Sequence, residues 1–185
     1  MPDFREEYLS DMRAQLAKLR GTAEQAMAQV SDGNFARVLD AEANSIAVIV
    51  KHVSGNLRSR CTDFLTSDGE KPSRDRDGEF VLQPRDSRPQ LLSDWAAAWG
   101  LLTATVEALR SEDLQRTIYI RGEPHTVGQA LNRHLGHLAY HVGQIVILAK
   151  HWAGAEWRTL TIPRGQSEAF TRAKQQEQLS ARRAT

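Results

Sequence analysis

The chain has 185 residues, the size of one ordinary domain and enough to build a hydrophobic core without disulfides or a structural metal. Apolar residues make up 41% of the sequence and charged residues 25%, which excludes a disordered chain. A formal charge of +1 argues against a dedicated nucleic-acid-binding protein, and the apolar runs are too short to span a bilayer. A single cysteine, Cys61, excludes an internal disulfide. We therefore expect a cytoplasmic protein that binds neither nucleic acid nor membrane.

The first half of the sequence predicts two long helices. Apolar residues at spacings of three and four run from about Phe4 to Val30, where the turn residues 31–34 end the pattern. A second such pattern runs from about Glu42 to Leu65. A long polar link, Thr66 to Arg88, follows. Links of this length are often functional, and in a four-helix bundle they can also cross over between parallel helices.

The second half predicts two more helices and a short strand. A helix from about Pro89 to Ser111 begins with proline, which suits the first helical turn. Residues 117–120 alternate like a strand and lead into a turn at 121–124. Thr126 and Gln129 form a capping-box pattern that opens the fourth helix, which continues to about Trp152.

The end of the chain is expected to add little to the fold. Trp157, Leu160 and Ile162 can pack back on the bundle, whereas the segment from Ser167 onward reads as a polar, short or frayed helix. No internal repeat or domain boundary is visible. The sequence therefore predicts a single all-α domain over 1–185, with a tail that frays from about residue 165.

Histidines cluster in the fourth predicted helix. His137 and His141 are four residues apart, so their imidazoles can reach one metal ion, and His134 stands one turn before His137 on the same side. Polar positions on a wet helix face, or core imidazoles bonded to carbonyls, explain this spacing equally well. His52, on the second helix, favours the metal interpretation, because facing helices of a bundle can place three imidazoles around one ion. Asn56, one turn after His52, could orient that ring or a bound water.

These residues resemble a known family. His52 on the second helix, followed by His137-Leu-Ala-Tyr-His141-Val-Gly-Gln144 on the fourth, is similar to the pattern of the DinB-like metal-dependent four-helix-bundle superfamily. Three further stretches resemble one branch of it, bacterial proteins labelled only as a domain of unknown function. These stretches are Asn44–His52, Thr62–Pro72 and Glu123–Val127.

The resemblance implies a four-helix bundle in up-down-down-up order, with the Thr66–Arg88 link as its crossover. It also implies a divalent metal, zinc or nickel, on His52, His137 and His141, and a homodimer. Relatives include S-transferases that use low-molecular-weight thiols, an isomerase and a hydrolase, whereas many members have no assigned reaction. His134 is an extra histidine that the pattern does not require. It could be a fourth ligand, but we favour a base beside the site or a bystander.

An enzyme is the leading functional hypothesis, because three histidines with open positions are typical of a catalytic metal. The reaction would be hydrolysis or low-molecular-weight-thiol transfer on a small-molecule substrate. Asn56, His134 and Tyr140 are the candidates for catalytic groups. A non-catalytic metal-binding or stress-associated protein, or a dimeric interaction protein, is the alternative. We expect Cys61 to be a buried, inert thiol, because no histidine of the same helix lies at a spacing that would place it beside the sulfur. We expect Arg58 and Arg60 to lie on a solvated face.

Overall fold

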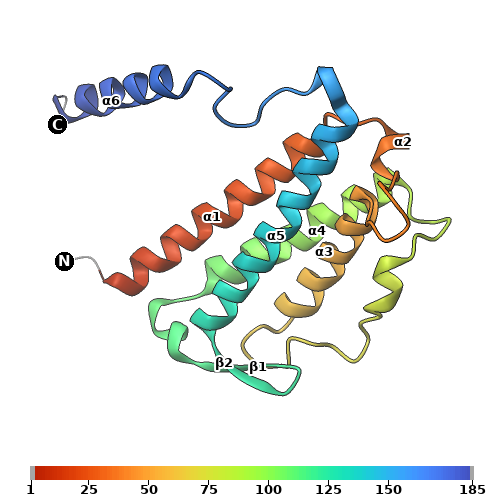
Figure 1. Cartoon of the computed structure of the whole chain (residues 1–185). Coiled ribbons are helices and arrows are strands. Elements are labelled where there is room, and N and C mark those ends of the chain that lie inside the picture. The colour runs from red at the N-terminus through yellow and green to blue at the C-terminus, as the bar shows by residue number, and fades with distance from the viewer. Residues whose placement is uncertain (1–2, 184–185) are drawn as a thin grey trace.

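Four long helices form the body of the molecule in the computed structural model, which describes residues 3–183 (Figure 1). They are α1 (Phe4–Met27), α3 (Ile46–Cys61), α4 (Arg88–Ala108) and α5 (Val127–Ala153). All four correspond to the predicted helices, with ends that differ by a few residues. The other helices are four short ones, α2 (Asp32–Phe35), η1 (Asp77–Phe80), η2 (Ser111–Gln115) and η3 (Gly154–Glu156), and the 17-residue helix α6 (Ser167–Arg183) near the end of the chain.

Contacts between helix ends establish the order of the bundle. The Tyr8 hydroxyl donates to the Gly128 carbonyl at 3.1 Å, so α1 and α5 start together. Arg88, at the start of α4, donates to the carbonyl of Met27, the last residue of α1, at 2.8 Å. The Thr105 hydroxyl donates to the Cys61 carbonyl, so α3 and α4 end together. Helices α1 and α5 therefore run opposite to α3 and α4, which confirms the up-down-down-up order with a crossover between α3 and α4.

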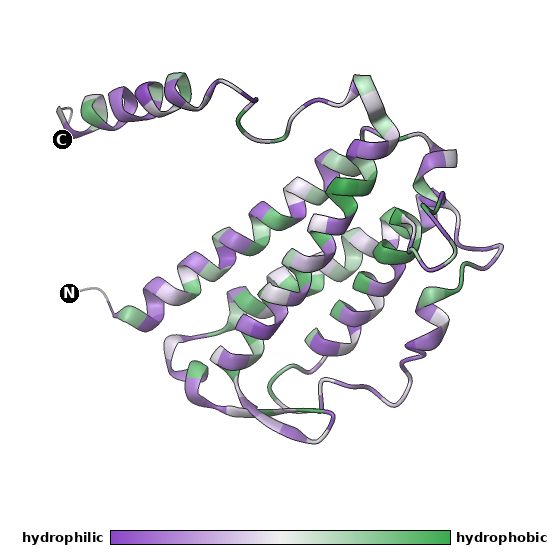
Figure 2. Cartoon of the chain, in the orientation of Figure 1, coloured by the Kyte–Doolittle hydropathy of each residue, from purple (hydrophilic) through white to green (hydrophobic). Residues whose placement is uncertain are grey.

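Side-chain caps fix where these helices begin. Ser45 accepts a hydrogen bond from the Val48 N–H at the start of α3, and Ser87 accepts one from the Gln90 N–H at the start of α4. Apolar side chains of the four long helices form the buried core. The crossover and α6 are largely hydrophilic (Figure 2). The largest fully buried side chains include Trp95, Trp99, Phe35, Met27, Ile49, Leu57, Leu138 and Ile145.

A β-hairpin closes one end of the bundle. Strand β1 (Thr117–Ile120) confirms the predicted strand, and it pairs antiparallel with β2 (Glu123–Thr126), which was not predicted. Only Arg121 and Gly122 form the turn, both with positive φ, so the turn predicted over 121–124 is shorter than expected. The Asp68 carboxylate accepts from both backbone N–H groups of this turn, at 2.9 and 2.7 Å, and so ties the crossover to the hairpin.

The tail behaves partly as predicted. Trp157 and Leu160 pack against the core, whereas Ile162 is 38% exposed. The segment after it forms the helix α6, which stands apart from the bundle (Figure 1). Residues 1–2 and 184–185 of the predicted domain lie outside the described residues. Among the helices that the structure describes, none has the length and apolar character needed to cross a membrane.

Candidate metal centre

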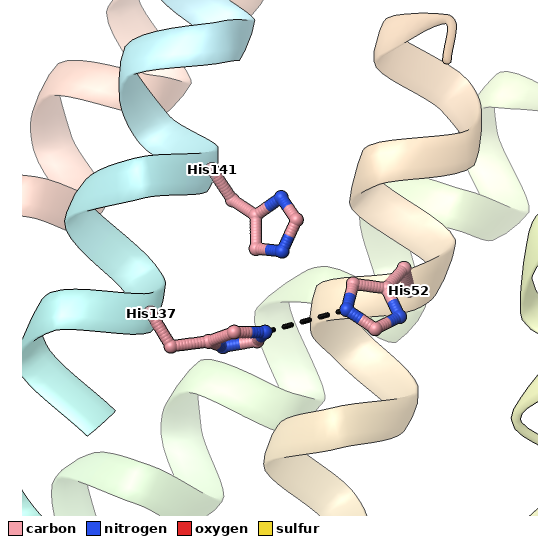
Figure 3. A group of neighbouring side chains, drawn as sticks. All are labelled: His52, His137 and His141. Atoms are coloured by element: carbon pink, nitrogen blue, oxygen red, sulfur yellow. Dashed lines mark hydrogen bonds between the residues drawn. The ribbon is translucent and has the colours of Figure 1, made fainter. Parts of the chain in front are cut away.

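Helices α3 and α5 position the three histidines. On α3, His52 follows a run of buried apolar residues and is itself 4% exposed. On α5, the reciprocal hydrogen bonds of Thr126 and Gln129 fix the start of the helix, as the capping-box pattern predicts. His137 and His141 then lie one turn apart on the face that looks toward α3 (Figure 3).

The three imidazoles converge at a spacing that suits one ion. Each ring offers one nitrogen, and these three atoms lie within 4.8 Å of one another. The shortest separation, between Nε2 of His52 and Nε2 of His137, is 3.3 Å (Figure 3). Two nitrogens on one tetrahedral zinc ion, with bonds of about 2.0–2.1 Å, lie about 3.4 Å apart. The predicted convergence of His52 with His137 and His141 across the core is therefore confirmed.

Hydrogen bonds turn two of these rings toward the common centre. Nδ1 of His52 lies 2.9 Å from the Glu79 carboxylate, and Nδ1 of His141 lies 2.8 Å from the Gln144 side-chain oxygen. Both acceptors require an N–H on Nδ1, which leaves the Nε2 lone pair of each ring free to bind a metal. Nδ1 of His137 is buried without a hydrogen-bond partner among the described residues.

The surroundings of His137 and His141 favour neutral rings, which are the metal-binding form. Burial lowers the pKa of His137 to about 3, with further contributions from His141, His52 and His134. Burial also lowers the pKa of His141, although its hydrogen bond to Gln144 acts in the opposite direction. Three imidazoles within reach of one point match the ligand chemistry of a divalent transition metal, so the residues present fit such an ion.

Glu79 is the functional residue that the sequence analysis missed. It lies in η1 of the crossover, and Arg74 holds its carboxylate through two hydrogen bonds of 2.8 Å. Burial raises the pKa of Glu79, but the hydrogen bonds from Arg74 and His52 outweigh burial and leave it below its ordinary value. The contact with His52 that we expected from Asn56 is thus made by an ionised carboxylate. Crossover residues follow no helical period, so no pattern in the sequence pointed to Glu79.

The three candidates for catalytic groups occupy different surroundings. Asn56 is buried one turn after His52 on α3. Tyr140 is 65% exposed, and its ring contacts that of His141 with centroids 5.1 Å apart. His134 is buried outside the three-histidine group, with Nε2 4.0 Å from the Cys61 sulfur. His134 is therefore the imidazole beside Cys61 that the sequence analysis did not expect.

The structure also tests the interpretations of Cys61 and of the two arginines, Arg58 and Arg60. Burial raises the pKa of Cys61 to about 12, which agrees with an inert thiol. Arg58 is solvated as expected, but the interpretation of Arg60 was wrong. Its side chain is 8% exposed and pairs with Glu70 at 3.0 Å, because the crossover folds back over the end of α3.

Comparisons with known proteins agree with this description. The sequence of residues 3–166 matches the family described as "Protein of unknown function (DUF1572)". No curated protein matches the sequence. The crystal structure of a DinB-like protein from Bacillus subtilis, YjoA, superposes with a TM-score of 0.61 over 80% of this chain and 96% of that one. At 15% identity, this likeness shows a shared fold. The chain therefore belongs to the DUF1572 family of proteins of unknown function, and it has the fold of the DinB-like superfamily.

Proposed function

We propose that this protein binds one divalent ion, zinc or nickel, through His52, His137 and His141, and that it is a metal-dependent enzyme. One observation carries the proposal: three buried or half-buried imidazole nitrogens from two helices lie within 4.8 Å of one another. Among the described residues, no fourth histidine, cysteine or carboxylate joins this group. Three protein ligands with a free position are typical of catalytic zinc sites, whereas structural sites have four.

A divalent ion held there supplies Lewis acidity toward an oxygen or sulfur atom of a small-molecule substrate. Hydrolysis and the transfer of a low-molecular-weight thiol both use this property. Glu79 is not free to act as a base, since its oxygens already accept from Arg74 and His52. Among the candidates for catalytic groups, Tyr140 is the one whose ring contacts one of the three histidines, His141.

We also propose that two copies associate through the outer face of α5 and that the protein works in the cytoplasm. Between the exposed charged residues Arg133 and Lys150, the exposed side of this helix carries only uncharged residues: Gly136, Ala139, Tyr140, Gly143 and Ile147. Tyr140 and Ile147 are 65% and 67% exposed, which suits a surface covered by a partner. The single free thiol, Cys61, fits a reducing compartment.

A turnover screen tests the catalytic part of the proposal. Metal-loaded protein is assayed against ester, amide and electrophile panels, with and without low-molecular-weight thiols. We expect turnover of at least one class, and we expect it to be lost in His137→Ala while circular dichroism shows a folded, helical variant. Metal-loaded protein that turns over no class would instead favour a non-catalytic metal-binding protein. Turnover that survives in His137→Ala would remove the site from the mechanism.

A further inference from the structure

The crossover between α3 and α4 is anchored by charge. The paired side chains of Arg74 and Glu79 are both buried in it, at 4% and 7% exposed. The apolar residues beside Glu79 are less covered: Phe80 is half-buried against the His52 ring, and Val81 is 54% exposed. Around residue 79, the crossover is therefore held against α3 chiefly by the Glu79 carboxylate rather than by apolar packing.

Gly55 makes the room for that carboxylate. It lies inside α3, one turn after His52, where glycine destabilises a helix relative to alanine. A Cβ atom at position 55 would overlap Oε1 and Cδ of Glu79. By contrast, a Cβ at Gly100 of α4 would meet no atom within 4 Å. Because Gly55 has no side chain, the Glu79 carboxylate can occupy the space next to this turn of α3.

We propose that Gly55 and Glu79 are a positioning pair that sets the orientation and tautomer of His52. Glu79 reaches Nδ1 of His52 only because position 55 has no side chain, and Arg74 holds the carboxylate in place through both oxygens. Nδ1 then carries the proton, and Nε2 turns toward His137. The inference about the His52 tautomer depends only on the contacts among Gly55, Glu79 and His52. The effect of this pair on metal affinity rests on the proposed function.

The tautomer can be measured without any metal. Long-range ¹H–¹⁵N NMR of the metal-free protein distinguishes Nδ1–H from Nε2–H imidazole. We expect the Nδ1–H form for His52 in the parent and in Gly100→Ala, which is the matched glycine control on another helix. Gly55→Ala and Glu79→Ala should each lose this preference. Glu79→Gln should retain much of it, because the amide oxygen can still accept from Nδ1. An unchanged His52 tautomer in Gly55→Ala would overturn the proposal.

Metal affinity gives a second readout through a double-mutant cycle. Loss of the partner that orients a metal-binding histidine typically costs 10–100-fold in affinity. In zinc titrations followed by calorimetry, we expect Gly55→Ala and Glu79→Ala each to weaken binding by about that factor. Adding Gly55→Ala to Glu79→Ala should cost nothing further, since the methyl group then meets no carboxylate. An equal loss from Gly55→Ala in both backgrounds would mean that the methyl group acts in some other way, and would overturn the pairing.

These experiments separate the two claims. A parent protein that binds no zinc would refute the proposed function, while the tautomer measurement would still decide the positioning pair. If Gly55→Ala alone fails to fold, the pairing predicts that Gly55→Ala with Glu79→Ala folds, because the overlap is gone. Failure of both variants to fold would overturn the pairing.

Discussion

Acid should destabilise the metal-free protein partly through His134. This residue is 7% exposed, and burial lowers its pKa to about 4, with smaller contributions from the positive charges of Arg60 and Arg133. In the unfolded chain a histidine titrates near 6.5, so between these values the unfolded state binds more protons than the native state. The resulting stability is complete above about pH 6.5 and is lost as the pH falls toward about 4. The difference between the pKa of His134 in the unfolded and native states corresponds to about 3 kcal/mol of unfolding free energy.

Urea unfolding of metal-free protein, followed by circular dichroism between about pH 7 and pH 4.5, measures this effect. His134→Leu should lose less stability than the parent over this range, because one buried titrating group is gone. Leu138→Ala, one turn further along α5, is the control: it should cost about 2–5 kcal/mol at every pH and keep the parent's slope. If the stability difference between His134→Leu and the parent does not change with pH, the assignment of acid sensitivity to His134 is wrong.

Three further predictions concern stability and reactivity away from the metal centre. Arg88→Ala removes hydrogen bonds of 2.8 and 2.9 Å to the carbonyls of Met27 and Val30 and a 2.7 Å ion pair with Asp32, so denaturant titration should show a loss of about 2–4 kcal/mol. A loss below about 0.5 kcal/mol would contradict this role. Thr126→Ala removes the cap of α5 and should cost about 1 kcal/mol, whereas Thr126→Ser should restore most of it; equal losses in both would argue against capping. Because burial raises the pKa of Cys61 to about 12, iodoacetamide should label this thiol only after unfolding, and fast labelling of the native protein would show that it is accessible.

Helical periodicity was sufficient to predict the four long helices, whereas their arrangement as an up-down-down-up bundle came from the family resemblance. Apolar spacing located α1, α3, α4 and α5, and the Thr126–Gln129 pattern located the start of α5. The convergence of the three histidines was predictable for a related reason. His52, His137 and His141 sit on helices whose inward faces are set by the same period, and the family resemblance supplied the set of three.

Residues whose partners come from distant or aperiodic segments were not predictable in this way. Glu79 lies on a crossover without periodic order, so nothing in the sequence indicated that it would reach Nδ1 of His52. Arg60 was expected to be solvated because its ion-pair partner, Glu70, lies on the same aperiodic crossover. The approach of His134 to Cys61 depends on the relative register of α3 and α5, which neither helix specifies alone.

Metal content is the measurement that tests the central claim most directly. The protein is purified without a histidine tag, loaded with Zn²⁺ or Ni²⁺, dialysed and assayed for bound metal per chain, beside His52→Ala, His137→Ala and the exposed control His151→Ala. We predict one ion per chain in the parent and in His151→Ala and none in the other two, together with a metal-dependent rise in melting temperature that follows the same pattern. A parent that retains no ion, or a His52→Ala variant that retains as much as the parent, would contradict the assignment of this site.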